Sequence, residues 1–202
     1  MKTVSIRAAA LAAAALVLCL SFSSCDLLGL VGVDPTDDAL YAANVDTYSG
    51  TLAGNTTFAA GRVAYVTSTL YVPSGATLTI QPGAIVKFAN NEGIIVESGG
   101  RIVANGTADA RIVFTSIKDD SKGGDSLLDG AGIPHAADWR YVWINSGASA
   151  NSFAYCDFAF GGANSEAVLY LDDEADVSHC DFHDNGGGTP GDESDEAVLH
   201  IR

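Results

Sequence analysis

The chain has 202 residues, of which 25 are Asp or Glu and 10 are Lys or Arg, so its formal net charge at pH 7 is −15. Nucleic acid is therefore not expected as a partner, and an anionic lipid surface is a poor one, because phosphate groups are bound by basic patches. Neutral glycans and metal ions are compatible with this charge, and the length suffices for one domain with a continuous core.

The N-terminal segment "MKTVSIRAAALAAAALVLCLSFSSC" has the layout of a bacterial export signal, with Lys2 and Arg7 before an apolar run and small polar residues after it. The run, 8–20, is shorter than the roughly 20 residues that span a bilayer. The end, "FSSC", resembles the lipobox of bacterial lipoproteins, which implies cleavage before Cys25 and lipidation of that cysteine. We therefore expect a signal peptide at 1–24 and an exported chain anchored in the bacterial cell envelope. Ordinary cleavage, leaving Cys25 free or paired, is the alternative.

Residues 25–47 show neither a steady period of 2 nor one of 3.6, and they contain a Pro and several Asp. This composition is typical of a linker. We expect a lipid-anchored tether that connects the membrane to the domain that follows.

Beyond Ser49, short apolar segments alternate with corners of Gly, Asn, Pro and Asp, as in "GATLTIQPGAIVKF" at 75–88, and helix signals are almost absent. A shift of 24 residues carries "CDF" at 156–158 onto "CDF" at 180–182. Other pairs at this shift are Leu70 with Ile94, Val72 with Val96, Leu78 with Ile102, Phe88 with Ile112, and Phe153 with Val177. A shift of 30 carries "SEAVLYL" onto "DEAVLHI". Such self-similarity predicts a repeat architecture.

Segments this short are buried only if each turn of chain stacks on the one before it, as parallel strands about 4.8 Å apart. The sequence therefore predicts an all-β fold over 48–202, a right-handed parallel β-helix with coils of about 24 residues. The "QPG" at 81–83 is expected to form a corner between two faces of one coil. An antiparallel sandwich is the competing fold, but its strands are not expected to recur every 24 residues.

The last residues, "EAVLHIR", end at Arg202 within a predicted strand. A β-helix needs its terminal edges protected. We therefore expect either that the β-helix domain is incomplete at its C-terminus or, if it is complete, that this edge pairs end to end with another chain.

The stretches "SGTLAGNTTF", "TLYVPSGATLTIQPGAIVKF" and "GRIVANGTADARIVFTS" resemble the opening coils of right-handed parallel β-helix proteins of the pectin-lyase-like kind, and the "CDF" coils resemble later repeats. The resemblance covers 47–202 apart from an insertion at 118–138. It implies a fold rather than an activity, since the scaffold carries lyases, hydrolases and adhesins. We expect a cell-envelope lipoprotein whose β-helix is a surface binding or structural module directed to a glycan. A polysaccharide lyase or hydrolase, or a fragment of one, is the alternative.

The resemblance to pectin-lyase-like proteins implies two kinds of catalytic site. Lyases of this kind hold calcium with carboxylates beside an Arg or Lys base. Hydrolases of this kind use paired Asp residues together with Gly-His-Gly and Arg-x-Lys signatures. Asp172 and Asp173 are such a pair, but the other two signatures are absent from the sequence. Basic residues are not expected inside acidic clusters on neighbouring coils. No catalytic residue is therefore assigned, and a groove that joined acidic residues to Arg140 or Lys118 would favour the enzymatic alternative.

The segment "DWRYVWIN" at 138–145 is the best candidate for ligand binding. If Val142 is buried, Trp139, Tyr141 and Trp143 share one outward strip, and exposed aromatic rings suit the stacking of sugars. Two registers are open: a shift of 24 pairs Trp143 with Ala167 and turns the ring inward, whereas a shift of 25 pairs Val142 with Ala167 and turns it outward. We favour rings that are buried or covered by the insertion.

The segment "SHCDFHDN" offers a weak site for a divalent cation, because a period of 2 directs His179 and Asp181 outward and stacking places Asp157 beside Asp181. Solvated surface is the favoured alternative, and no cofactor is otherwise expected. The same geometry makes Cys156 and Cys180 inward neighbours, close enough for a disulfide. Parallel side chains in a packed ladder favour free thiols.

Overall fold

A computed structural model of the chain describes residues 44–128, 130–148, 150–165, 167–186 and 199–201, all within one compact unit, 38–202. Within these ranges the regular elements are strands, apart from the 3-10 turn η2 (Ala163–Ser165). Among the described residues, no helix is long and apolar enough to cross a membrane. The expected signal peptide, Cys25 and most of the expected tether lie outside the described residues.

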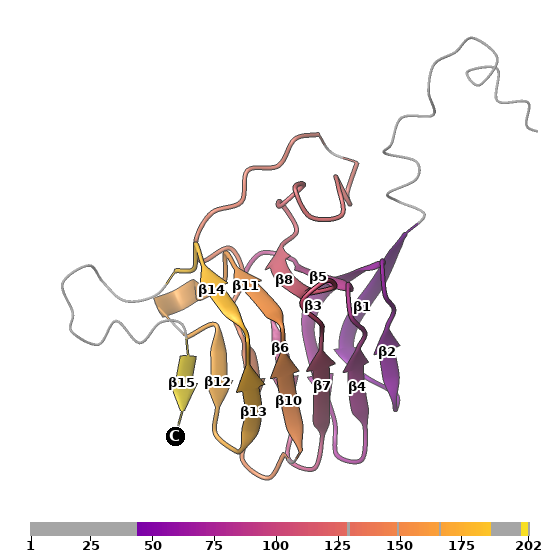
Figure 1. Ribbon diagram of the computed structural model, residues 1–202, viewed down its shortest axis with the longest axis vertical. Coiled ribbons are helices and arrows are strands. Elements are labelled where there is room, and N and C mark those ends of the chain that lie inside the picture. Colours follow the sequence, from indigo (N-terminus) through magenta and orange to yellow (C-terminus); the bar gives the residue numbers. More distant parts are fainter. Residues whose placement is uncertain (1–43, 129, 149, 166, 187–198, 202) are drawn as a thin grey trace, which may run out of the picture. The chain divides into compact units, whose positions relative to one another are not determined.

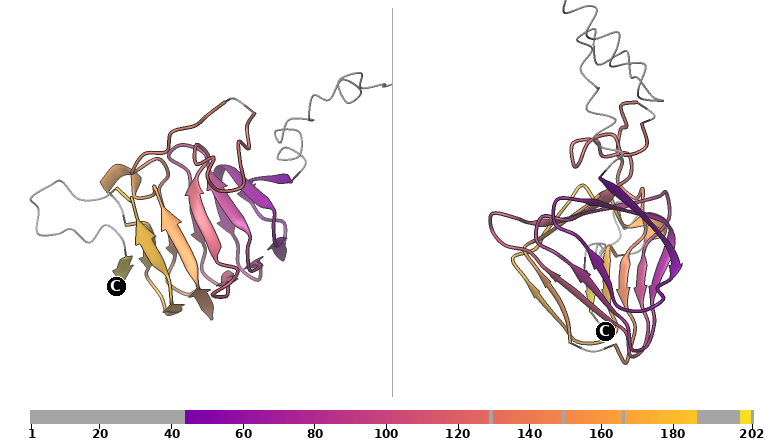
Figure 2. Two further views of the ribbon diagram at one scale, coloured as in Figure 1. Left: turned by 45° about the horizontal axis from the view of Figure 1, so that its top comes forward. Right: turned by 90° about the vertical axis from the view of Figure 1, so that its right-hand side faces the viewer.

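The strands wind into a β-helix with three faces (Figures 1 and 2). The first face consists of β2 (Thr56–Phe58), β4 (Thr77–Ile80), β7 (Arg101–Asn105), β10 (Asn151–Ala154) and β13 (Ala175–Ser178). The second face consists of the first half of β3 (Val63–Val72), β5 (Ile85–Phe88), β8 (Ile112–Ser116), β11 (Cys156–Ala159) and β14 (Asp181–His183). The third face consists of the second half of β3, β6 (Ile94–Val96), β9 (Val142–Ile144), β12 (Leu169–Leu171) and β15 (Leu199–Ile201).

Because β3 runs through the corner between them, the second and third faces form one ten-stranded sheet, which also includes β1. The first face is a separate sheet of five strands. Strand β1 (Val45–Thr51) pairs with β3 at the N-terminal end of the stack. It begins three residues before the expected domain start at 48.

All pairings between the named strands are parallel, which confirms the predicted all-β parallel β-helix. The predicted shift of 24 residues holds for pairs on all three faces. These pairs are Leu70 with Ile94, Val72 with Val96, Leu78 with Ile102, Phe153 with Val177, and Phe158 with Phe182. The shift of 30 also holds, since Leu169 pairs with Leu199.

The predicted pairing of Phe88 with Ile112 is wrong, because Phe88 pairs with Ser116 at a shift of 28. The corner between the first and second faces is longer in the coil of β7 and β8 than in the coil of β4 and β5. Four additional residues there, in the turn around Thr107 and Ala110, move the second face out of the 24-residue period. The spacing between paired residues therefore depends on the lengths of the corners between them.

The "QPG" corner lies where the sequence places it, between β4 on the first face and β5 on the second. Gly83 has a φ of 78°, a conformation that residues with a Cβ rarely adopt. The N–H of Ala84 donates to the carbonyl of Gln81 over 3.1 Å and closes the turn.

The core is filled by the inward side chains of successive coils, which stack on their register partners. The rings of Phe114, Phe158 and Phe182 form one such ladder, with centroid separations of 4.5 Å and 4.9 Å and nearly parallel planes. Phe114 and Phe158 are fully buried, whereas Phe182 is only partly buried. Each coil therefore depends on its neighbours for burial.

The insertion leaves β8 and returns at β9, near its predicted position, and Figures 1 and 2 show it outside the coils. It covers the outer side of the second face. Lys87 on β5 is fully buried there and donates from Nζ to the carbonyl of Gly124 over 2.7 Å. The hydroxyl of Thr115 donates to Asp119 over 2.8 Å. An outward position of a solenoid thus becomes interior where the insertion packs on it.

Candidate ligand-binding face

The outer side of the third face carries a row of large side chains, one from each coil, which we call the outer ladder. Its members are Tyr71, Ile95, Trp143, Tyr170 and His200, each opposite the next in the parallel register. On β3, β6, β9 and β12 the residues on both sides of each member are buried, so the ladder residue between them points outward and is only partly buried. Three of the five side chains, Tyr71, Trp143 and Tyr170, are aromatic, and His200 adds an imidazole ring.

The rings at the C-terminal end of the ladder contact one another. The ring centroids of Trp143 and Tyr170 are 6.3 Å apart, and those of Tyr170 and His200 are 5.1 Å apart. Tyr141 packs edge-on against both Trp143 and Tyr170, at 5.7 Å and 5.9 Å. Arg140 places its guanidinium carbon 4.5 Å from the centre of the Tyr141 ring. Such tilted and edge-to-face contacts are favourable geometries for aromatic pairs.

A carboxylate fixes the indole of Trp143 in this cluster. Trp143 donates from Nε1 to Oδ2 of Asp172 over 2.9 Å, and Asp172 follows β12 directly. The next residue, Asp173, accepts from the N–H of Glu174 over 2.8 Å, and also from the N–H of Gly147. The pKa of Asp173 is lowered by these two backbone hydrogen bonds. The lowered pKa keeps Asp173 ionised at neutral pH, at the corner that follows β12.

A hollow of about 560 Å³ lies beside Asp172, the hydrogen-bond partner of Trp143. Its lining includes the acidic residues Asp172, Asp173, Glu174 and Asp176, together with Asn151, Leu171 and Ile201. This volume lies in the range of small-molecule sites. Carboxylates accept hydrogen bonds from hydroxyl groups, so the hollow and the ladder together suit a ligand with an apolar ring face and hydroxyl edges.

The structure separates the three aromatic residues of "DWRYVWIN". Val142 and Ile144 are buried and Trp143 points outward, as the strip hypothesis requires. Trp139 is not on the strip: it is fully buried, stacks on Phe88 with a centroid distance of 4.3 Å, and donates from Nε1 to the carbonyl of Ala159. The alternation that predicts an outward Trp139 fails because β9 begins only at Val142.

Tyr141 is only 5% exposed. Its two aromatic neighbours, one of them on β12, lie against its ring. Both registers considered for Trp143 are wrong, because Trp143 pairs with Tyr170 at a shift of 27. The corner that holds η2 adds residues between β11 and β12, which the repeat of the neighbouring coils does not reveal.

The residues proposed for a cation do not form a site together. Asp157 and Asp181 are register neighbours as predicted, but Arg111 lies between them and pairs with each carboxylate over 2.7 Å. His179 lies in the bend before β14, with a φ of 53°, and stacks on Tyr155 at 4.5 Å. Within the described ranges, no group of three or more His, Cys, Asp or Glu side chains is placed to hold a metal ion. The proposed combination is therefore wrong, because a guanidinium occupies the position between the carboxylates.

Arg111 also corrects the expectation that basic residues avoid acidic clusters on neighbouring coils. A second such pair is Lys118 with Asp138, over 2.8 Å. Burial would raise the pKa of Asp138, but hydrogen bonds from Lys118, the N–H of His135 and the hydroxyl of Ser116 outweigh it and lower the pKa. Both pairs connect segments of the fold, and each carboxylate already has a cationic partner.

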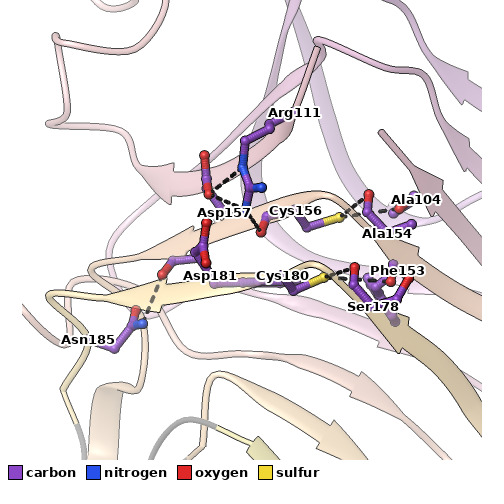
Figure 3. A network of polar contacts seen from close by, with 11 residues as sticks. Ala104, Arg111, Phe153, Ala154, Cys156, Asp157, Ser178, Cys180, Asp181 and Asn185 are labelled. Atoms are coloured by element: carbon purple, nitrogen blue, oxygen red, sulfur yellow. Dashed lines mark hydrogen bonds and ion pairs between the residues drawn. The ribbon is translucent and has the colours of Figure 1, made fainter. Parts of the chain in front are cut away.

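Cys156 and Cys180 are free thiols, one coil apart, as Figure 3 shows. The pKa of Cys180 is lowered to about 7, chiefly because the neighbouring thiol of Cys156 favours the thiolate form of Cys180, with Arg111 adding a favourable charge. The pKa of Cys156 is raised, chiefly because the same interaction with Cys180 keeps Cys156 protonated and also because the side chain is buried. The favoured prediction of free thiols is confirmed.

Three ring-bearing members of the outer ladder are absent from the sequence-based candidates: Tyr71, Tyr170 and His200. A signal for them exists, since "LYV", "VWI", "LYL" and "LHI" share a large polar or aromatic residue between two apolar ones. These triplets can be recognised as one row of side chains only if it is known that they lie on the same face. Unequal corners hide that alignment.

Taken together, these features define a parallel β-helix protein with an aromatic ladder on one outer face. A family model described as "Pectate-lyase like beta helix domain" matches residues 50–168, more than half of the chain. The chain belongs to this family. Comparisons with curated proteins and with solved structures returned no match. Within the ladder, Tyr71, Ile95 and Trp143 lie inside the matched region, whereas Tyr170 and His200 follow it.

Proposed function

We propose that the chain is an exported, lipid-anchored protein of the bacterial cell envelope whose β-helix binds a neutral glycan on its third face. Membership of the pectate-lyase-like family supports a polysaccharide-related module in general terms. The observation that carries the binding role is the contact between Trp143, Tyr170 and His200 on three successive coils. Their row runs across the strands, along the axis of the stack.

The chemistry of the face favours a sugar. Aromatic rings stack on the apolar faces of pyranose rings, and the carboxylates of the adjoining hollow accept hydrogen bonds from hydroxyl groups. A polyanionic glycan is disfavoured, because the chain carries a net charge of −15 and the hollow is lined by acidic residues. We therefore expect a neutral polysaccharide that lies along several coils.

A direct test measures binding of the full chain in detergent to an array of neutral and acidic polysaccharides, with and without calcium. The matched variants are Tyr170→Ala, in the ladder, and Tyr155→Ala, which removes the same ring from a corner outside it. We expect the first substitution to weaken binding of a neutral glycan at least several-fold and the second to leave it unchanged. Equal effects of the two substitutions, or binding to none of the polysaccharides, would refute the proposal.

The enzymatic alternative, a polysaccharide lyase or hydrolase, draws on Arg111 and Lys118, each of which pairs with carboxylates. Each of these carboxylates already pairs with a cation, which favours a structural role. The same array material provides the check, because a lyase would generate unsaturated products and a hydrolase new reducing ends. If the parent chain forms either product and Arg111→Gln or Lys118→Gln does not, the protein is an enzyme and the binding proposal is wrong.

The envelope address rests on the sequence of 1–47: an export signal at 1–24, lipidation of Cys25, and a tether at 25–47. Several acyl chains on one residue give a stable anchor, since each buried methylene contributes about 0.8 kcal/mol. In a bacterial host fed a labelled fatty acid, we expect the full chain to take up label and to sediment with membranes. The variant Cys25→Ser should lose both properties, and label retained by this variant would contradict the address.

A further inference from the structure

The two free cysteines occupy equivalent surroundings, one coil apart. Each follows a corner between the first and second faces, and each thiol lies against two backbone carbonyls. Cys156 Sγ is 3.5 Å from the carbonyl oxygen of Ala154 and 3.2 Å from that of Ala104, whereas Cys180 Sγ is 3.4 Å from that of Ser178 and 3.6 Å from that of Phe153. Ala154 pairs with Ser178, and Ala104 pairs with Phe153. The two sulfur atoms therefore occupy equivalent positions on successive coils.

This equivalence sets the separation of the sulfurs. Neighbouring parallel strands are about 4.8 Å apart, so two side chains related by one coil have their ends separated by about one strand spacing or less. A disulfide needs sulfurs about 2.05 Å apart. A metal–thiolate bond is about 2.3 Å long, and two such bonds in line bridge a separation close to that of the coils. Figure 3 shows the two sulfurs on the same side of their strands.

We propose that Cys156 and Cys180 bind one soft monovalent metal ion, of the copper(I) or silver(I) kind, in linear coordination between their sulfurs. Thiolates are the ligands that such soft ions prefer, and linear coordination needs only two of them. Zinc takes four ligands, and the described part of the chain places no third His, Cys, Asp or Glu side chain with these two.

The binding step balances in charge and in protons. One thiolate and one thiol take up the monovalent cation, two sulfur–metal bonds form, and one proton leaves to solvent, so that the resulting bis-thiolate complex carries a charge of −1. Arg111 lies beside the site and donates from its guanidinium to the carbonyl of Cys156 over 2.9 Å. It is also paired with Asp157 and Asp181, so the residues that face the pair include one cation and two carboxylates.

The site can be reached from one side. Cys156 is fully buried, whereas Cys180 is only partly buried. An ion arriving from solvent therefore meets Cys180 first.

The test uses the full chain with Cys19→Ser and Cys25→Ser, which leaves Cys156 and Cys180 as its only thiols. The reduced protein is titrated with copper(I) against a chromophoric copper(I) chelator. We expect one ion per chain, bound in competition with the chelator, and loss of that ion in both Cys156→Ala and Cys180→Ala. X-ray absorption of the loaded protein should show two sulfur neighbours and no nitrogen or oxygen.

Thermal unfolding monitored by circular dichroism establishes that both variants are folded. A measurement without core substitutions supports the titration: silver(I) should protect both thiols of the parent chain from alkylation, as counted by mass spectrometry. The proposal is overturned if the parent chain takes up no copper(I) against the chelator, if Cys180→Ala binds as tightly as the parent, or if the thiols of the exported protein are found joined in a disulfide.

Discussion

Trp143 on β9 lies directly opposite Tyr170 on β12, with the two ring centroids 6.3 Å apart and their planes tilted by 53°. Both residues are flanked by buried side chains that hold their strands to the core. The indole is further fixed by its hydrogen bond to Asp172. The two rings therefore form a preorganised surface on the outside of the β-helix, and preorganisation lowers the entropic cost of binding.

Asp172→Ala should weaken glycan binding without large loss of stability, because it releases the indole of Trp143 from its hydrogen bond. A hydrogen bond of this kind contributes about 0.5–1.5 kcal/mol, so we expect the dissociation constant to rise about 2- to 10-fold. Isothermal calorimetry measures the change. Asp109→Ala, an exposed residue on another corner, is the control for net charge, and an equal loss in both variants would point to charge rather than ring position.

Phe158→Ala should destabilise the β-helix strongly, since Phe158 lies between Phe114 and Phe182 in the buried ring ladder. Large-to-small substitutions of buried aromatic residues cost about 3–5 kcal/mol. Phe182→Ala serves as the matched variant and should cost less, because Phe182 is only partly buried. Urea unfolding gives both values, and the opposite order would contradict a core centred on Phe158.

Gly161→Ala should displace Trp139 from the core. A Cβ at position 161 would lie 2.8 Å from the indole carbons of Trp139 and even closer to Val168. We expect a loss of about 1–3 kcal/mol in the free energy of unfolding, as for other overpacked sites. In a Trp143→Phe background, the fluorescence of Trp139 should shift to the red. Gly54→Ala, with open space around its position, should change neither quantity.

Asp138→Asn should destabilise the fold near neutral pH and not in acid. The pKa of Asp138 is lowered in the folded state, so its ionised form contributes stability above the pKa of an unfolded Asp, about 3.9, and this contribution is lost as the pH falls through the folded value. We expect a cost of about 1–3 kcal/mol near neutral pH. Urea unfolding at several pH values measures it, and a difference that persisted unchanged in strong acid would exclude this origin.

Lys87→Met should change how the free energy of unfolding depends on pH in the alkaline range. Burial lowers the pKa of Lys87, and the nearby Asp120, Asp119 and Asp125 offset this only in part. Between the lowered folded value and the unfolded value of about 10.4, the unfolded chain binds more protons, so stability rises with pH in this window. Relative to Lys87→Met, the parent should therefore gain stability as the pH rises toward about 10.

Lys122→Met provides the control for Lys87→Met, since it removes an equal charge from the insertion that covers Lys87, at a position that is not fully buried. We expect the alkaline change to be larger for Lys87→Met than for Lys122→Met. Parallel pH profiles for the two variants would show that the insertion does not bury Lys87 in solution.

The sequence determined the winding of the chain. The apolar residues of "TLTI" and "AIVKF" on either side of Gln81–Gly83, and the repeats of Phe153 and Phe158 after 24 residues, predict stacked coils because such short segments have no other way to be buried. The same local logic predicts the insertion and the neighbouring positions of Cys156 and Cys180.

The tertiary structure decided which side chains meet on the surface, because that depends on the lengths of corners and not on the pattern within strands. Four extra residues in one corner move Phe88 from Ile112 to Ser116, and the corner with η2 sets Trp143 opposite Tyr170. A corner residue contributes nothing to the apolar repeat, yet it changes the spacing between paired residues of that coil and its neighbour. The coils could therefore be predicted from the sequence. The outer ladder and the position of Arg111 between two carboxylates could be identified only in the three-dimensional structure.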